Sequence, residues 1–230
     1  MTSSANHLLH LLTRKDRDRL LSDCQSVDLK LAEVICESGE RMRYVYFPED
    51  CFFSYVALNE GKPSLEIGMV GSEGMLGEQL MLGELAAPFH AVVQGPGLAW
   101  RIRSDAFLRQ LRESQPLQRV LKRYLHVRLL QLGQLAVCVH FHQVNPRLAR
   151  WLLMSQDRAH ADSFHMTHEF MAYLLGVRRV GITKAAGSLQ RDGLIEYHHG
   201  FMSVRDRPGL EAAACSCYAR DTEVYDRLLR

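Results

Sequence analysis

The sequence of 230 residues predicts an α+β fold built from three successive parts. In the first half, short apolar runs alternate with turn residues, a pattern typical of a jelly-roll β-barrel. The centre is one long stretch of helical periodicity, and the last third combines short amphipathic helices with a β-hairpin. We therefore expect the barrel in residues 1–115, a long helix with a hinge in 116–144, and a separate C-terminal domain in 145–230.

The barrel is predicted from eight short apolar runs at intervals of roughly ten residues. Glycine, proline and charged residues separate the runs, as in Gly95-Pro96-Gly97. The last run has Leu98, Trp100 and Ile102 at every second position, which is the period of a strand with one solvent-facing side. The predicted strands are Val27–Leu31, Val34–Cys36, Tyr44–Phe47, Cys51–Ala57, Leu65–Val70, Gly77–Leu82, His90–Val93 and Leu98–Ile102.

A long helix is predicted over residues 116–141, because apolar side chains recur there every three or four positions. About 26 residues span ~39 Å at 1.5 Å per residue, which is longer than a small sheet needs to cover itself. We therefore expect the helix to pack against its copy in a dimer. Burial wholly within its own chain is the alternative. The expected dimer-interface residues are Leu117, Leu121, Tyr124, Arg128, Leu132, Leu135 and Val139.

A helix break is predicted at Asn145-Pro146, because the residue before a proline avoids the α-helical region. Residues 147–154 then carry apolar side chains at helical spacing and predict a supporting helix. The break is therefore the expected boundary of the C-terminal domain.

Residues 167–195 predict two short helices joined by a tight turn. Thr167 is a good N-cap, and Gly176 is placed to end the first helix in the left-handed conformation. The second helix is expected to bury Ile182, Ala185, Ala186 and Leu189. A helix that has one apolar and one basic side, and that follows such a turn, fits the major groove of DNA. An ordinary helical hairpin with a solvated charged face is the alternative.

The second helix, at about residues 178–191, is the predicted recognition helix. Its expected DNA-binding residues are Arg178, Arg179, Val180, Thr183, Lys184 and Arg191. Two strand-like runs, 194–197 and 201–204, follow it and flank His198-His199-Gly200. This pattern predicts a hairpin with glycine in its turn, so the domain is predicted to be a winged helix-turn-helix. The two histidines are expected to face DNA phosphates.

The charge distribution fits a polyanion only in the later parts of the chain. Residues 1–115 hold 12 Lys/Arg against 16 Asp/Glu, residues 116–143 hold 4 against 0, and residues 144–207 hold 9 against 6. The sequence begins without a recognisable secretory signal, and its longest uncharged stretch, 129–146, is too polar for a membrane span. We therefore expect a cytoplasmic protein.

Neither metal ligands nor catalytic residues are predicted. The spacings of the six cysteines fit neither a zinc ribbon nor an iron–sulfur motif. Cys215-Ser216-Cys217 is interpreted as two ordinary thiols in a helix, with a redox or metal role as the alternative. His140-Phe141-His142 is similar to a metal-binding motif of cupins but lies at the end of the long helix. A cupin-like metalloenzyme is thus an alternative from another class.

The order of these parts resembles the Crp/Fnr superfamily of bacterial transcription regulators over nearly the whole chain. In the barrel the resemblance rests on Glu37-x-Gly39-Glu40, Tyr44-x-Tyr46-Phe47 and Gly71-x-x-Gly74-x-x-Gly77-Glu78. In the C-terminal domain it rests on residues 174–179, 189–195 and 206–210. The resemblance implies a β-roll sensor similar to cyclic-nucleotide-binding domains, and double-stranded DNA, a second copy of the chain and RNA polymerase as partners.

The sequence departs from the cyclic-AMP-binding members after Gly77-Glu78. Those members carry an Arg-Ser pair whose arginine meets the cyclic phosphate, whereas this chain reads Ala86-Ala87-Pro88-Phe89-His90. Burying a phosphate without a cationic partner is costly, so an effector other than cyclic AMP is expected. Glu78, Pro88 and Phe89 are the candidate effector-binding residues. No cofactor is predicted, and the small-molecule effector is unknown.

The recognition helix departs from the Arg-Glu-x-x-x-Arg pattern of the best-known members. Arg179 matches, Val180 replaces the glutamate, and Lys184 replaces the second arginine. Arg179 can contact guanine N7 and O6, while Val180 suits a thymine methyl group. The sequence therefore predicts a homodimeric DNA-binding transcription regulator, not an enzyme, that reads a palindromic operator. A DNA-binding architectural protein without an effector is the second alternative.

Overall fold

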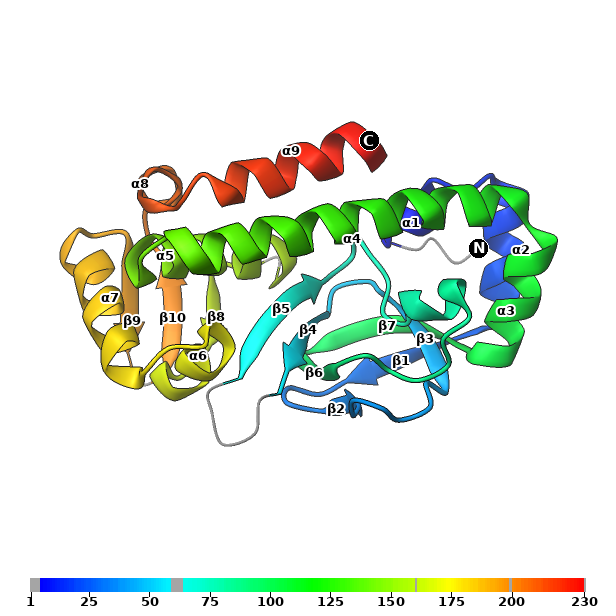
Figure 1. The fold of residues 1–230 in the computed structure, drawn as a ribbon, viewed down its shortest axis with the longest axis horizontal. Helices are drawn as coiled ribbons and strands as arrows, with labels where there is room; N and C mark the ends of the chain where they lie inside the picture. The colour runs from blue at the N-terminus through cyan, green and yellow to red at the C-terminus, as the bar shows by residue number, and fades with distance from the viewer. Residues whose placement is uncertain (1–4, 59–63, 160, 199, 230) are drawn as a thin grey trace. The chain divides into compact units, whose positions relative to one another are not determined.

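The computed structural model describes residues 5–58, 64–159, 161–198 and 200–229 (Figure 1). Two compact units are present. The first unit comprises Met1–Tyr55, Met69–Arg128 and Arg227–Arg230, and the second comprises Val56–Gly68 and Leu129–Asp226. The long helix α4 (Gln115–Phe141) contributes its first part to the first unit and its second part to the second unit. Among the described residues, no helix is both long and apolar enough to cross a membrane.

Two antiparallel sheets make the β-roll. One has the order β1-β7-β3, from β1 (Cys24–Leu29), β7 (Gly97–Arg103) and β3 (Tyr44–Pro48). The other has the order β2-β6-β4-β5, from β2 (Val34–Cys36), β6 (His90–Gly95), β4 (Phe52–Ala57) and β5 (Leu65–Val70). Ile102 of β7 is opposite both Cys24 and Val45 in the register. The two-residue period predicted for Leu98, Trp100 and Ile102 is wrong: in β7, Ala99 and Ile102 are buried and Leu98 is exposed. β4 and β6 are buried along nearly their whole length, so apolar residues on successive positions build the roll core.

Seven of the eight predicted strands are present among the described residues, and the prediction for Gly77–Leu82 is wrong. That run contains a short 3₁₀ helix, η1 (Glu78–Leu82). Gly77 and Gly83 flank it at φ 106° and 86°, left-handed values that a strand does not adopt. A Cβ at Gly77 would also lie 3.1 Å from Cγ2 of Val45, so the chain turns where it passes closely over β3.

Helices cover the ends of the roll. They are α1 (His7–His10), α2 (Arg14–Ser22), α3 (Ser104–Glu113) and the first part of α4. Within this unit the buried α4 residues include Leu117, Leu121, Tyr124 and Arg128. The sequence assigned these four to a dimer interface, and the structure corrects this. They are covered by their own chain because that side of α4 supplies part of the core of the first unit.

The second unit contains, besides the later part of α4, the helices α5 (Val144–Ala159), α6 (His168–Leu175), α7 (Arg179–Arg191), α8 (Arg207–Ala213) and α9 (Cys217–Leu229). The strands β8 (Ser163–His165), β10 (Phe201–Val204) and β9 (Ile195–His198) form a sheet in that order. α5 contacts both α7 and α8.

The helix break predicted at Asn145-Pro146 lies slightly earlier. α4 ends at Phe141 and α5 begins at Val144, so Pro146 lies in the first turn of α5. A proline is tolerated there because the first amides of a helix have no partner within the helix. The break itself is therefore at residues 142–143.

Candidate functional site

The helix-turn-helix begins and ends at the residues that the sequence indicated. The Thr167 side chain caps α6 by accepting from the Phe170 backbone N–H at 3.1 Å. Gly176 ends α6 in the left-handed conformation, φ 65°, and its N–H donates to the Ala172 carbonyl. Arg178 is in an extended conformation immediately before α7. A tight turn thus presents the N-terminal end of α7.

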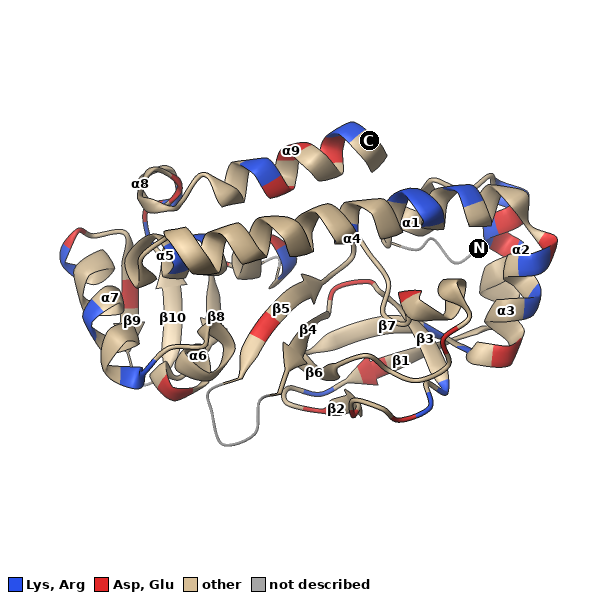
Figure 2. Cartoon of the chain, in the orientation of Figure 1, with Lys and Arg blue, Asp and Glu red and all other residues tan. Residues whose placement is uncertain are grey.

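The two sides of α7 differ as the periodicity predicted. Its buried residues are Ile182, Ala185, Ala186 and Leu189. The predicted DNA-binding residues Arg178, Arg179, Val180, Thr183, Lys184 and Arg191 are all exposed. Val180 is 65% exposed, which is unusual for a large apolar side chain on a helix with a buried side. Figure 2 shows basic residues along α7, which contains no acidic residue.

The Thr183 hydroxyl makes two contacts within the protein that the sequence did not indicate. Its hydroxyl donates to the Arg179 carbonyl at 3.1 Å and lies 3.2 Å from Nδ1 of His168 on α6. The His168 ring stacks on Tyr197 of the wing, with centroids 4.3 Å apart. Burial lowers the pKa of His168, and the charge of Arg179 lowers it further. His168 thus connects α6, α7 and the wing, a role that no sequence motif indicated.

The wing has three strands rather than the two of the predicted hairpin. β9 and β10 pair from Ile195–Val204 to His198–Phe201, as the predicted hairpin requires. β8 adds a third strand, with His165 opposite Phe201. The short polar run of β8 had no strand signal in the sequence. Of the two histidines predicted to face phosphates, His198 is exposed and His199 lies outside the described residues.

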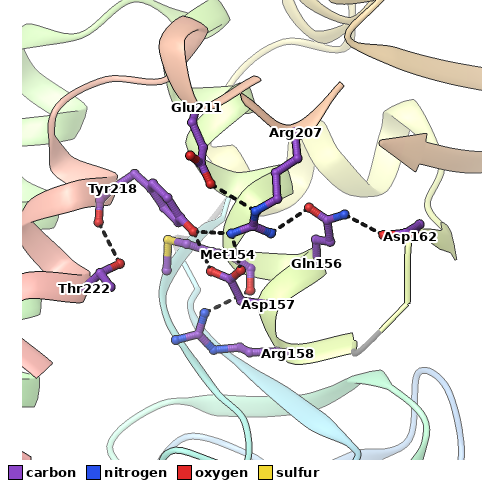
Figure 3. A network of polar contacts seen from close by, with 9 residues as sticks. All are labelled: Met154, Gln156, Asp157, Arg158, Asp162, Arg207, Glu211, Tyr218 and Thr222. Atoms are coloured by element: carbon purple, nitrogen blue, oxygen red, sulfur yellow. Dashed lines mark hydrogen bonds and ion pairs between the residues drawn. The ribbon is translucent and has the colours of Figure 1, made fainter. Parts of the chain in front are cut away.

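Arg207 connects α8 to α5 and α9 (Figure 3). It donates to Gln156 at 2.8 Å and to Asp157 at 2.7 Å, both on α5. It also donates to Glu211 of α8 at 2.9 Å and to the Tyr218 hydroxyl of α9 at 2.7 Å. Arg207 follows the N-cap Asp206, so the cap that starts α8 also places the guanidinium over α5. This network fixes the supporting helix on which α7 packs.

Inside the roll, two of the three candidate effector residues meet at one tyrosine. The Tyr55 hydroxyl donates to Glu78 at 2.6 Å, and the Tyr55 ring packs edge-on against Phe89 at 6.3 Å. Burial raises the pKa of Tyr55, and the neighbouring carboxylate of Glu78 raises it further, so the hydroxyl keeps its proton. Pro88 is exposed, and its carbonyl accepts from Ser38 at 3.1 Å. Glu78 and Phe89 therefore share a site with Tyr55, and Pro88 contributes backbone nearby.

Residues 86–90 contain no arginine, but Arg128 of α4 brings a guanidinium to Glu78. Arg128 Nε lies 3.5 Å from Glu78 Oε1, and the guanidinium lies over the Tyr55 ring at 5.6 Å. Arg128 Nη1 also donates to the Met69 carbonyl at 3.3 Å. Helical periodicity placed Arg128 on an apolar stripe but could not identify a partner 50 residues earlier in the chain.

Ligand-type side chains gather in the second unit, where the sequence predicted no metal. Cys138, His142, Cys215 and Cys217 each have a ligating atom, and these atoms all lie within 4.8 Å of one another. His140 is exposed and is not part of the group, so the His-x-His pair is split. A cupin-type site is therefore not formed by these two histidines.

Two domain families match the chain. The cyclic nucleotide-binding domain matches residues 26–114, and the Crp-like helix-turn-helix domain matches residues 146–213. Together these segments make up more than half of the chain. No curated protein sequence matches it.

Solved structures share the fold at low sequence identity. A putative regulator of the Crp/Fnr family from Eubacterium rectale has a TM-score of 0.70 at 16% identity, over 90% of this chain and 96% of that one. FixK2 from Bradyrhizobium japonicum has 0.70 at 14%, over 84% and 98%. The c-di-GMP responsive global regulator CLP from Xanthomonas campestris has 0.68 at 18%, over 84% and 99%. With both domain families present in this order, the chain belongs to the Crp/Fnr family of DNA-binding transcription regulators.

Proposed function

We propose that the protein acts as a homodimer that reads a palindromic operator with one α7 helix in each half-site. The exposed basic side of α7, presented by the turn at Gly176, is the observation that carries this proposal. Arg179 is placed to contact a guanine, and the exposed Val180 suits a thymine methyl group. Arg178, Lys184 and Arg191 are placed to hold phosphates, so affinity should fall steeply with salt. RNA polymerase is the further partner that we propose.

An exposed apolar stripe on the second part of α4 supports the dimer. Leu129 is 65% exposed, and Leu132, Ala136 and Val139 are exposed at positions three and four residues apart. Residues at these spacings lie on one side of a helix. Two of them, Leu132 and Val139, belong to the interface predicted from the sequence, and Leu135 is half-buried. We propose a second copy as the occupant because the stripe repeats the helical period of a two-helix seam.

The proposed regulation is a signal in the roll that shifts the dimer helices, and thereby the spacing of the two reading heads. Arg128 supports this coupling because it lies on α4 while its charged group contacts Glu78 and Tyr55 inside the roll. A ligand that separates Arg128 from Glu78 would act directly on α4. Cyclic AMP does not suit the site, because the Glu78 carboxylate already pairs with this cation. An effector-independent architectural role is the alternative outcome.

The proposal is tested by selecting bound sequences from random DNA with the purified full chain, and by titrating ligands against the recovered site. We expect two inverted half-sites about one helical turn apart, ~34 Å. Recovery of sequences without inverted symmetry would contradict the dimeric reader. DNA affinity that is unchanged across all ligands would favour the architectural role.

A further inference from the structure

The structure brings two separate pairs of ligand-type residues together in the second unit. Cys138 and His142 are one helical turn apart at the end of α4, and the His142 N–H donates to the Cys138 carbonyl at 3.1 Å. Cys215 and Cys217 lie at the start of α9. Cys138 Sγ is 3.6 Å from Cys215 Sγ, and Cys217 Sγ is 3.4 Å from His142 Nδ1.

We propose that these four residues form a structural zinc site of the Cys₃His type. Zn²⁺ binds thiolates at about 2.3 Å and imidazoles at about 2.0 Å, so tetrahedral geometry separates two sulfurs by about 3.8 Å and a sulfur from a nitrogen by about 3.5 Å. The observed separations, 3.6 Å between two sulfurs and 3.4 Å between a sulfur and a nitrogen, are close to the S–S and S–N edges of that tetrahedron. With four protein ligands the site is closed, which is typical of structural rather than catalytic zinc.

The compactness of the group favours a single ion over a cluster. All four ligating atoms lie within 4.8 Å of one another. In an iron–sulfur cluster the ligands bind different iron atoms and are therefore spread around the cluster. Soft thiolates combined with one imidazole in tetrahedral array are typical of zinc.

Burial makes ordinary free thiols an incomplete explanation. Cys138, Cys215 and Cys217 are all buried, at 1%, 7% and 0% exposure, and they form a cluster of their own. Buried cysteines elsewhere, such as Cys36 and Cys51, lie in the roll without a second thiol beside them among the described contacts. A thiol is a weak donor and acceptor, so packing three of them against an imidazole nitrogen gains little without an ion.

One side chain near the cluster donates a hydrogen bond to a thiol. The Gln134 side chain donates to Cys217 Sγ at 3.0 Å. Such hydrogen bonds orient metal ligands and tune their charge. Gln134 lies one turn before Cys138 on α4, so the same helix supplies one ligand and this donor, and His142 directly follows its end.

The net charge of an occupied zinc site would be balanced by a nearby arginine. Three thiolates with one Zn²⁺ and a neutral imidazole leave one net negative charge in the interior. Two buried arginines, Arg147 and Arg150, lie on α5, and the Cys215 backbone N–H donates at 3.3 Å to the carbonyl of Pro146, the residue before Arg147. Arg150 is paired with Asp221 at 2.5 Å, whereas Arg147 donates to the neutral Leu175 carbonyl at 2.6 Å. A buried cation is costly without a counter-charge, and the occupied site would provide one beside Arg147.

The site would fix the end of α4 to the start of α9. It goes beyond the proposed function, because DNA reading by α7 does not require it. Metal binding of this kind contributes directly to folding free energy. The spacings between successive cysteines could not reveal this site, because Cys138 and Cys215 are 77 positions apart.

The test measures metal in the full chain, purified under anaerobic reducing conditions. We expect about one zinc ion per chain by mass spectrometry of the metal. Cys217→Ser and Cys138→Ser should lose the metal, while the matched control Cys51→Ser, a buried thiol of the roll, should keep it. Gln134→Leu should keep all four ligands yet weaken zinc affinity about 10- to 100-fold.

A second measurement does not depend on the stability of the variants. Zinc is removed from the wild-type chain with a chelator and replaced by Co²⁺. We expect sulfur-to-cobalt charge transfer and the intense visible bands of tetrahedral cobalt, with the melting temperature lowered by chelation and restored by zinc. A wild-type chain that binds neither ion would overturn the proposal. So would a Cys138–Cys215 disulfide in the freshly purified metal-free protein, or unchanged zinc content in Cys217→Ser.

Discussion

Arg128 Nε lies 3.5 Å from Oε1 of Glu78, so the long helix pairs its cation with the acidic residue of the candidate effector site. Replacing Arg128 with Met should destabilise the first unit by about 3 kcal/mol, because the Glu78 carboxylate, 15% exposed, would lose its cationic partner. Urea unfolding measures this loss. The double variant Arg128→Met/Glu78→Gln should recover part of it. If the single variant unfolds like wild type, the pair contributes nothing.

Cyclic AMP should not stabilise the protein. The residues 86–90 offer no arginine, and Arg128 is already paired with Glu78. A ligand that binds only the folded state adds about 2.7 kcal/mol to the free energy of unfolding at a hundredfold excess over its dissociation constant. The melting temperature rises as a result. We expect no shift in a thermal unfolding experiment with cyclic AMP. A concentration-dependent rise would contradict the assignment of the site.

Arg207 should matter for the DNA-binding domain although it contacts no DNA in our account. Its four side-chain partners connect α5, α8 and α9 (Figure 3). Arg207→Ala should lower the unfolding free energy by about 1–2 kcal/mol, a value reduced because the side chain is 37% exposed. The control Arg205→Ala removes an exposed wing ion pair with Glu196 and should cost at most about 1 kcal/mol. Equal losses would contradict the network's role.

The exposed apolar stripe on α4 predicts that a charged substitution there lowers the mass of the protein in solution. Leu129→Asp places a charge on the exposed apolar side of α4 and should convert the proposed dimer to a monomer in sedimentation experiments. Leu82, 73% exposed at the end of η1, provides the control, and Leu82→Asp should remain dimeric. A Leu129→Asp protein with the mass of a dimer would show that another surface holds the copies together.

His168 predicts a pH dependence of stability. Its folded pKa is lowered from the ordinary value of 6.5, so the unfolded chain binds more protons below that value. Stability should therefore be complete above about pH 6.5 and be lost as pH falls toward the folded pKa. His168→Phe keeps a ring against Tyr197 and should remove this part of the slope. Parallel slopes for the two proteins between pH 5 and 8 would exclude His168 as the source.

The sequence predicted the helical periodicity of α7 well and long-range pairing poorly. The buried stripe of α7 and the caps at Thr167 and Gly176 depend on residues within a few positions, so they could be derived. The strand β8 could not be derived in this way, because its three residues are a strand only through their pairing with β10.

The same limit explains the misassigned residues of α4 and why the proximity of the cysteines was not predicted. Periodicity showed that one side of α4 is apolar, yet Tyr124 and Arg128 face their own roll, while Leu129 is exposed. Choosing between a partner helix and the chain's own core requires tertiary contacts. Cys138 and Cys215 likewise meet only in the folded unit.

The assignment of α7 as the DNA reader is tested most directly at Arg179. Sequences bound by the wild-type chain and by Arg179→Ala are selected in parallel from random DNA at one fixed salt concentration. We predict that the variant loses preference for one guanine in each half-site, at a cost of ~1–3 kcal/mol, and keeps the other preferences. An unchanged motif bound with unchanged affinity would contradict the account.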